Sequence, residues 1–177
     1  MNTIEQIQAF FIRIAATPFK KQTAISFAEQ IANAHYVGIL LPDSPEFSSI
    51  QEGLKALINS MRKRKLILIS SDAEFEQKLK STQKQINLEL KQQNLWTLSR
   101  SINLKQLSRE SVDIFVDLNE TPTLLGIYLS CKMKATVRTC LAPPHRLASF
   151  NLIYHHNEAA SYPEKLNGFI TFLNQFD

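Results

Sequence analysis

Glycine is scarce in this chain, with only four in 177 residues. The G-x-G-x-x-G motif and the P-loop need closely spaced glycines, because there the backbone must approach phosphate groups. The segment LLPDSPEFSSI (residues 40–50), which follows the first strand-like run, contains two prolines and no glycine. This absence argues against the common NAD, FAD and ATP sites, and we expect no cofactor.

Cysteine and histidine are also few, with two and four residues respectively. Cys131 and Cys140 show no C-x-x-C spacing, so two reduced thiols are expected. His155 and His156 end a strand-like run, where adjacent side chains point to opposite faces, so we expect no metal site. No apolar run approaches the roughly 18 residues that span a bilayer. Since no signal-peptide pattern opens the chain, a cytoplasmic protein without a transmembrane segment is expected.

The excess of positive charge is small, at +4. The only dense basic cluster is Arg62-Lys63-Arg64-Lys65, where we expect the last turn of a helix. Cations at that place complement the negative end of the helix dipole. A site for nucleic acid or an acidic membrane surface is the alternative interpretation, and nucleic acid is not the partner that we expect.

What the sequence does contain is an alternation of short apolar runs with helical patterns. The runs HYVGILL (35–41), KLILIS (65–70) and VDIFVDL (112–118) are nearly continuous, as in strands buried on both faces of a parallel sheet. The alternation predicts an α/β fold: a single Rossmann-like domain at 35–177, with a mostly parallel sheet and helices on both faces. A helical extension at 1–34 precedes it.

The periodicity also predicts the individual elements. Helices are expected at 3–16, 24–34, around Ile50 to Ile58, at 72–85 and at 102–110, then one opened by Thr121-Pro122 and one capped by Ser161 with Glu164. Weaker strands are expected at 86–90, 134–139 and 150–155. The segment NLWTLSR (94–100) gives no assignment.

The first helix carries one apolar stripe, because its large apolar residues recur every three or four positions. The stripe consists of Ile4, Ile7, Phe10, Phe11 and Ile14. It either covers the protein's own sheet edge or groove, or docks a partner. Trp96, the only tryptophan, is either an interface anchor or a packing residue. These six residues form the candidate interaction surface.

Polar residues cluster where the expected strands end, which is where open α/β sheets bind ligands. The candidate ligand-binding residues are Asp43, Ser44, Ser71, Asn119 and Thr121, and the candidate catalytic bases are Glu46 and Asp117. Most of these positions have a second explanation. Asp43 with Glu46, Ser71 with Glu74, and Thr121 with Pro122 are patterns typical of helix N-caps.

Several short motifs resemble the N-terminal, acceptor-side half of the family-nine glycosyltransferases, the heptosyltransferase group with the two-domain GT-B fold. Val116-Asp117-Leu118 is similar to the family's I-D-L strand end, and the helical Leu124 to Leu129 follows it. Residues 131–138 (CKMKATVR) are similar to its S-G-A-K-x-R-I-G turn and strand, and residues 150–153 (FNLI) to its F-N-L strand. The resemblance spans about Tyr36 to Phe176 and implies a sugar or nucleotide-sugar ligand.

The chain also departs from that family. Lys132 and Arg138 replace turn glycines, and Glu46 falls nearest the place of the family's catalytic Asp. The chain ends at Asp177, where the family's linker to the donor domain begins, so we expect half of such an active site to be missing. The sequence is more similar to a family of single-domain bacterial proteins that resemble this half alone. That resemblance rests on Asn94-Leu95-Trp96 and residues 113–118 (DIFVDL), and it implies the fold without an activity.

These observations predict a non-catalytic binding or scaffold module, with a protein partner or self-association. The alternative is a glycosyltransferase-like enzyme, or a sugar or nucleotide-sugar binder, whose donor site comes from a partner chain.

Overall fold

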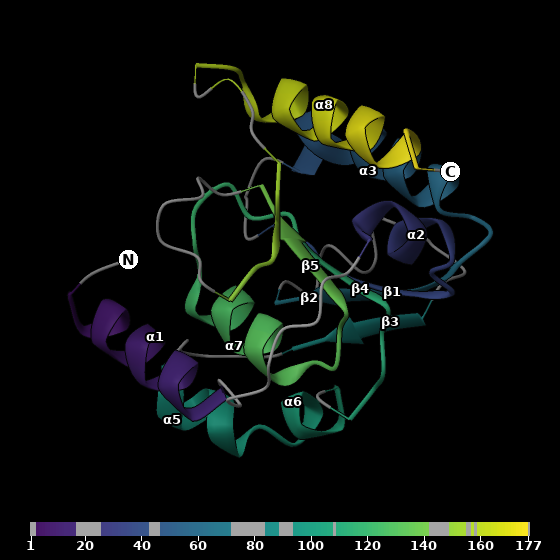
Figure 1. Ribbon diagram of the computed structural model, residues 1–177. Helices are drawn as coiled ribbons and strands as arrows, with labels where there is room; N and C mark the ends of the chain where they lie inside the picture. Colours follow the sequence, from purple (N-terminus) through teal and green to yellow (C-terminus); the bar gives the residue numbers. More distant parts are fainter. Residues whose placement is uncertain are drawn as a thin grey trace.

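The computed structural model describes residues 3–16, 26–42, 47–71, 84–88, 94–107, 109–141, 149–154, 157 and 159–176 (Figure 1). Its helices are α1 (Thr3–Ala16), α2 (Phe27–Ala32), α3 (Phe47–Ser60), α5 (Leu95–Arg100), α6 (Ile102–Leu107), α7 (Leu124–Lys132) and α8 (Tyr162–Asn174). Its strands are β1 (Tyr36–Leu40), β2 (Lys65–Ser70), β3 (Lys84–Asn87), β4 (Ile114–Asp117), β5 (Val137–Cys140) and β6 (Leu152–Ile153).

The described strands form one sheet in the order β3-β2-β1-β4-β5-β6, and every neighbouring pair is parallel. The chain builds outward from β1 to β3 and then returns to place β4 on the other side of β1. This is the strand order of a doubly wound Rossmann-like domain. The predicted α/β fold is therefore confirmed.

Helices cover both faces of the sheet (Figure 1). On one face α2, α3 and α8 pack over alternate strand residues, among them Val37, Ile39 and Val116. On the other face α1, α5, α6 and α7 pack over the intervening residues, such as Leu40 and Phe115. Because β1, β2 and β4 are buried on both sides, their sequences are continuously apolar rather than alternating.

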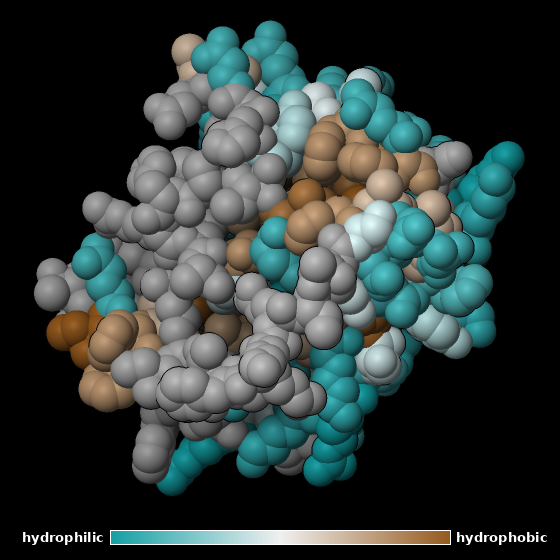
Figure 2. All heavy atoms as spheres, viewed as in Figure 1, coloured by the Kyte–Doolittle hydropathy of each residue, from teal (hydrophilic) through white to brown (hydrophobic). Residues whose placement is uncertain are grey.

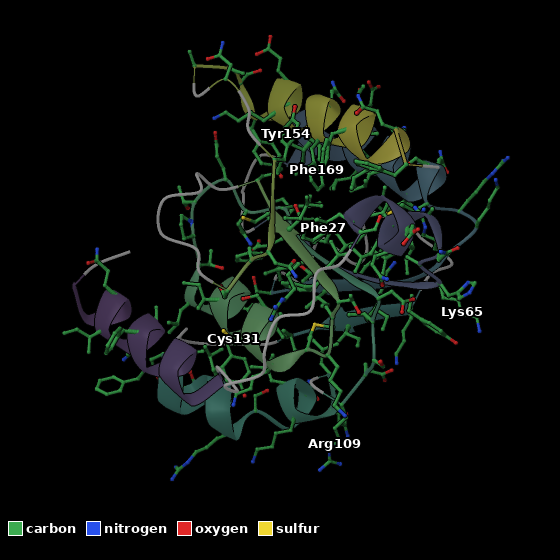
Figure 3. The ribbon with its side chains drawn as sticks, viewed as in Figure 1. Phe27, Lys65, Arg109, Cys131, Tyr154 and Phe169 are labelled. Atoms are coloured by element: carbon green, nitrogen blue, oxygen red, sulfur yellow. The ribbon has the colours of Figure 1, made fainter. Side chains whose placement is uncertain are left out.

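Aromatic rings line the inner side of α8. Tyr154 and Phe169 meet edge to face with centroids 5.6 Å apart, and Figure 3 shows them together beneath the helix. Phe172 continues the row, with its ring centroid 5.4 Å from that of Tyr154. This packing fixes α8 over the sheet.

Three predicted details are wrong. The helix after β4 is capped by Thr123 rather than Thr121, since the Thr123 hydroxyl accepts from the Gly126 backbone N–H at 3.0 Å. The basic cluster follows α3 in a turn and enters β2, instead of forming the last helical turn. Lys84 and Gln85, expected at a helix end, belong to β3, because they pair with β2 in parallel register.

Most other predicted elements stand with shifted boundaries, whereas residues 72–83 of the helix predicted at 72–85 lie outside the described residues. β2 has the predicted range, and β5 and β6 are shorter than expected. The unassigned segment forms α5, which begins with a capping box between Asn94 and Thr97. Cys131 and Cys140 are not joined by a disulfide, as expected. The division at residue 34 stays a prediction.

No helix in the part of the chain that the structure describes is both long and apolar enough to cross a bilayer.

Candidate functional site

The strand order reverses between β1 and β4, and the carboxyl ends of these two strands define the place where ligands enter folds of this kind. Leu40 and Asp117 are register partners at these ends. The Leu118 backbone N–H donates to the Leu40 carbonyl at 3.0 Å, so the two strands stay paired to their last residues. Asp117 therefore lies at the switch point of the sheet.

Asp117 is buried, and its carboxylate is engaged by its own loop. The Asn119 backbone N–H and side-chain amide both donate to Asp117 Oδ1, at 3.0 and 2.7 Å. Asn119 is itself buried. A short side chain that accepts from the backbone two residues ahead fixes a tight turn, so this pair shapes the exit from β4.

The second carboxylate oxygen, Asp117 Oδ2, faces the first turn of α7. A Cβ atom added at Gly126 would collide with this oxygen, and it would also come within 3.1 Å of Thr123 Oγ1. Only glycine lets the helix approach the carboxylate this closely. Asp117 thus lies between its own turn on one side and the helix on the other.

Two residues of α8 reach the same strand end. The Tyr162 hydroxyl donates to the Leu118 carbonyl at 2.7 Å, and Lys165 Nζ lies 2.6 Å from Glu120 Oε1. The Lys165 side chain is only 9% exposed and that of Glu120 48%. The ion pair therefore joins an almost buried ammonium group to a carboxylate that water still reaches.

The charges of this cluster act on Tyr162. Its pKa is raised well above the usual 10, first by burial and then by the negative charges of Asp117 and Glu120. The hydroxyl therefore stays protonated at neutral pH and serves as a hydrogen-bond donor. The Tyr162 hydroxyl is therefore not suited to act as a general base at neutral pH.

The polar groups of this cluster bind one another and so stabilise the carboxyl ends of the strands. Among the described residues, no group of three or more His, Cys, Asp or Glu side chains could hold a metal ion. The Asp117 carboxylate, the Tyr162 hydroxyl and the Lys165 ammonium each have a protein partner. The chemistry that the geometry supports is hydrogen bonding at a preformed edge.

The predicted site residues are partly brought together. Asp117 and Asn119 are in contact, whereas Thr121 is exposed two residues further on. Ser71 is half-buried at the end of β2, one strand away from the switch point. The remaining predicted site residues, Asp43, Ser44 and Glu46, lie outside the described residues.

Sequence reasoning missed Glu120, Tyr162 and Lys165. The contacts of α8 with the end of β4 join residues 44 and 45 positions apart. No local pattern signals such a contact, although Tyr162 and Lys165 both lie in the first turn of the helix that Ser161 was predicted to cap.

The candidate interaction surface lies on α1. Ala9 and Ile12 are buried on the side of the helix that packs with α7, whereas Ile7, Phe10 and Phe11 are 52%, 56% and 57% exposed. Figure 2 shows apolar atoms over α1 at the left of the molecule. The side chains of Ile4, Ile14 and Trp96 lie outside the described residues.

Comparison of the chain with models of known protein families and with curated proteins gave no match.

Proposed function

We propose that this protein is a non-catalytic binding module whose fold resembles the N-terminal half of the family-nine glycosyltransferases. We further propose that the outer face of α1, which carries Ile7, Phe10 and Phe11, docks a protein partner. The observation that carries the proposal is the exposure of Ile7, Phe10 and Phe11 on one helix face. Large apolar side chains grouped on a surface are typical of interaction sites. An amphipathic helix that docks through such side chains is a common mode of recognition.

The position of this face supports docking rather than internal packing. α1 already buries Ala9 and Ile12 in the core, so the helix is held in place without its large aromatic side chains. The Phe10 and Phe11 rings meet edge to face, with centroids 6.0 Å apart. Aromatic side chains of this kind are frequent anchors at protein interfaces.

The polar edge at β4 supports the absence of catalysis. A general base must reach a substrate proton within about 3 Å. Asp117 instead accepts two hydrogen bonds from Asn119 and packs against α7. The proposed role of this edge is to hold β4, α7 and α8 together.

The test is purification of the tagged full-length protein from its own host at native abundance. We expect a protein at fixed stoichiometry with the wild type, and its loss in Phe10→Ser/Phe11→Ser. Tyr36→Ser removes an exposed aromatic residue on β1 and is the matched control, expected to retain the partner. An equal yield of partner from all three proteins would contradict docking at α1.

The alternative function is a sugar or nucleotide-sugar binder, or a glycosyltransferase-like enzyme whose donor site comes from another chain. Its favouring observation is the place of Asp117 at the switch point of the sheet. In that case nucleotide sugars should raise the melting temperature by mass action. Turnover of a nucleotide sugar that is lost in Asp117→Asn, with the fold intact, would replace our proposal by the alternative.

A further inference from the structure

A basic pocket lies at the other end of the strands from the switch point, next to the amino ends of β1 and β2. Its volume is about 390 Å³, and its lining includes His35, Ser60, Arg62, Lys63, Arg64 and Phe176. His35 immediately precedes β1, and the three cations immediately precede β2. The pocket is therefore separate from both the switch point and the outer face of α1.

Two of these cations have no side-chain partner within the described part of the chain. Arg62 and Lys63 are exposed, and their side chains form no hydrogen bond or ion pair there. Asp113, which is close to His35, uses Oδ2 to accept the backbone N–H groups of His35 and Tyr36 at 2.8 and 2.9 Å. That carboxylate oxygen is thus already engaged by the backbone.

The third cation has a structural role. The Arg64 guanidinium is buried and donates from Nη2 to the carbonyl of Ile31 at 3.0 Å. This bond adds a charged donor to a carbonyl in the last turn of α2, where the helix dipole is negative. The contact with α2 therefore explains Arg64. Arg62 and Lys63 lie exposed in the turn that follows α3, where their charges complement the negative end of that helix and stay accessible to a ligand.

The size and lining of the pocket indicate its ligand. Its volume falls within the usual range of about 300–1,000 Å³ for small-molecule sites, well above the space of a lone ion. Ala32, Ala34 and the half-buried Phe176 add an apolar wall. Adjacent Arg and Lys side chains suit a phosphate group, since the arginine fork binds it bidentately and the lysine adds a point charge.

We propose that this pocket binds a small phosphorylated organic compound, with its phosphate on Arg62 and Lys63 and its organic part against Phe176. A nucleic acid fits less well, because its binding typically uses a basic patch or stripe wide enough to contact several phosphates. Here the cations are confined to a single turn between α3 and β2.

Calorimetry on the full chain with AMP, inorganic phosphate and a short single-stranded RNA tests the proposal. We expect saturable one-to-one binding of AMP, tighter than that of phosphate. Arg62→Ala/Lys63→Ala should weaken the binding of AMP at least tenfold. Lys55→Ala/Lys134→Ala removes the same charge at two exposed positions elsewhere and should leave the affinity unchanged.

Three results would overturn the assignment. The first is no saturable binding of AMP, and the second is an equal loss of affinity in the two double variants, which would indicate a general effect of net charge. The third is RNA binding that is tighter than AMP binding and falls steeply with salt, which would identify a nucleic-acid surface instead.

Discussion

Asp117 is a carboxylate enclosed by protein groups: Oδ1 accepts from Asn119, and Oδ2 faces the first turn of α7. The sequence already placed this residue at the end of a strand, and the structure adds the close approach of the helix. Both this packing and the neighbouring Lys165–Glu120 ion pair should contribute to the stability of the fold.

Gly126→Ala should destabilise the protein, although alanine is favoured over glycine in helices by up to about 1 kcal/mol. The added Cβ meets the Asp117 carboxylate, and overpacking of this kind costs about 1–3 kcal/mol. In an Asp117→Ala background the obstacle is gone, so the same change should be neutral or stabilising. Urea unfolding of the four proteins measures this coupling, and additive effects would contradict the contact.

The Lys165–Glu120 pair should respond unequally to loss of either partner. Glu120→Gln leaves an almost buried ammonium group without its counter-charge and should cost about 1–3 kcal/mol. Lys165→Met removes the charge but keeps the apolar stem, so its cost should stay below about 1 kcal/mol.

The matched control is the exposed pair of Lys84 and Glu110, 2.7 Å apart, whose removal should cost less than about 0.5 kcal/mol. Denaturant unfolding gives all of these values. If Lys165→Met lowers the free energy of unfolding more than Glu120→Gln does, the unpaired ammonium group does not destabilise the fold as we infer.

Tyr162 should make stability fall at alkaline pH. Its folded-state pKa is raised above the usual 10, so above pH 10 the unfolded chain loses a proton that the folded protein keeps. The free energy of unfolding therefore declines as pH rises through this range. Tyr162→Phe should cost about 1 kcal/mol at pH 8 through the lost bond to Leu118, yet show a smaller decline by pH 10.5.

Tyr36→Phe is the control for the alkaline experiment, because Tyr36 is exposed. It should keep the alkaline decline of the wild type. Equal slopes for wild type and Tyr162→Phe would contradict the raised pKa.

At the scale of elements, α1 has two faces with different roles. Ile12→Ala should cost about 2–4 kcal/mol, because Ile12 is buried in the core beside α7. Phe11→Ser should change the free energy of unfolding by no more than about 0.5 kcal/mol. Thermal or urea unfolding separates the two, and a large loss in Phe11→Ser would show that this side chain supports the fold.

The sequence predicted the elements best where one physical signal dominated. The continuous apolar run of β2 has the predicted range, and the Ser161–Glu164 pair opens α8 as expected, with Glu164 Oε2 accepting from the Ser161 N–H at 2.8 Å. The start of α7 was misplaced because Thr121 and Thr123 are both suitable caps, and only the backbone geometry selects Thr123. α5 was missed because its capping box uses Asn and Thr instead of the common Ser/Thr with Glu/Gln.

On the scale of the whole molecule, the alternation of elements predicted the parallel sheet but not which side of β1 receives β4. That choice creates the switch point and gathers Asp117, Glu120 and Lys165 at one edge. Nor could periodicity show which side of α1 faces the core. A stripe of large apolar residues predicts burial, whereas the structure buries the smaller Ala9 together with Ile12.

The most direct test of docking at α1 is photo-crosslinking in the native host, with a photoreactive phenylalanine analogue placed at Phe11 or, as the control, at Tyr36. Docking at α1 predicts one discrete covalent adduct with another protein from position 11 and none from position 36. No adduct from position 11, or the same adducts from both positions, would contradict a docking surface on α1.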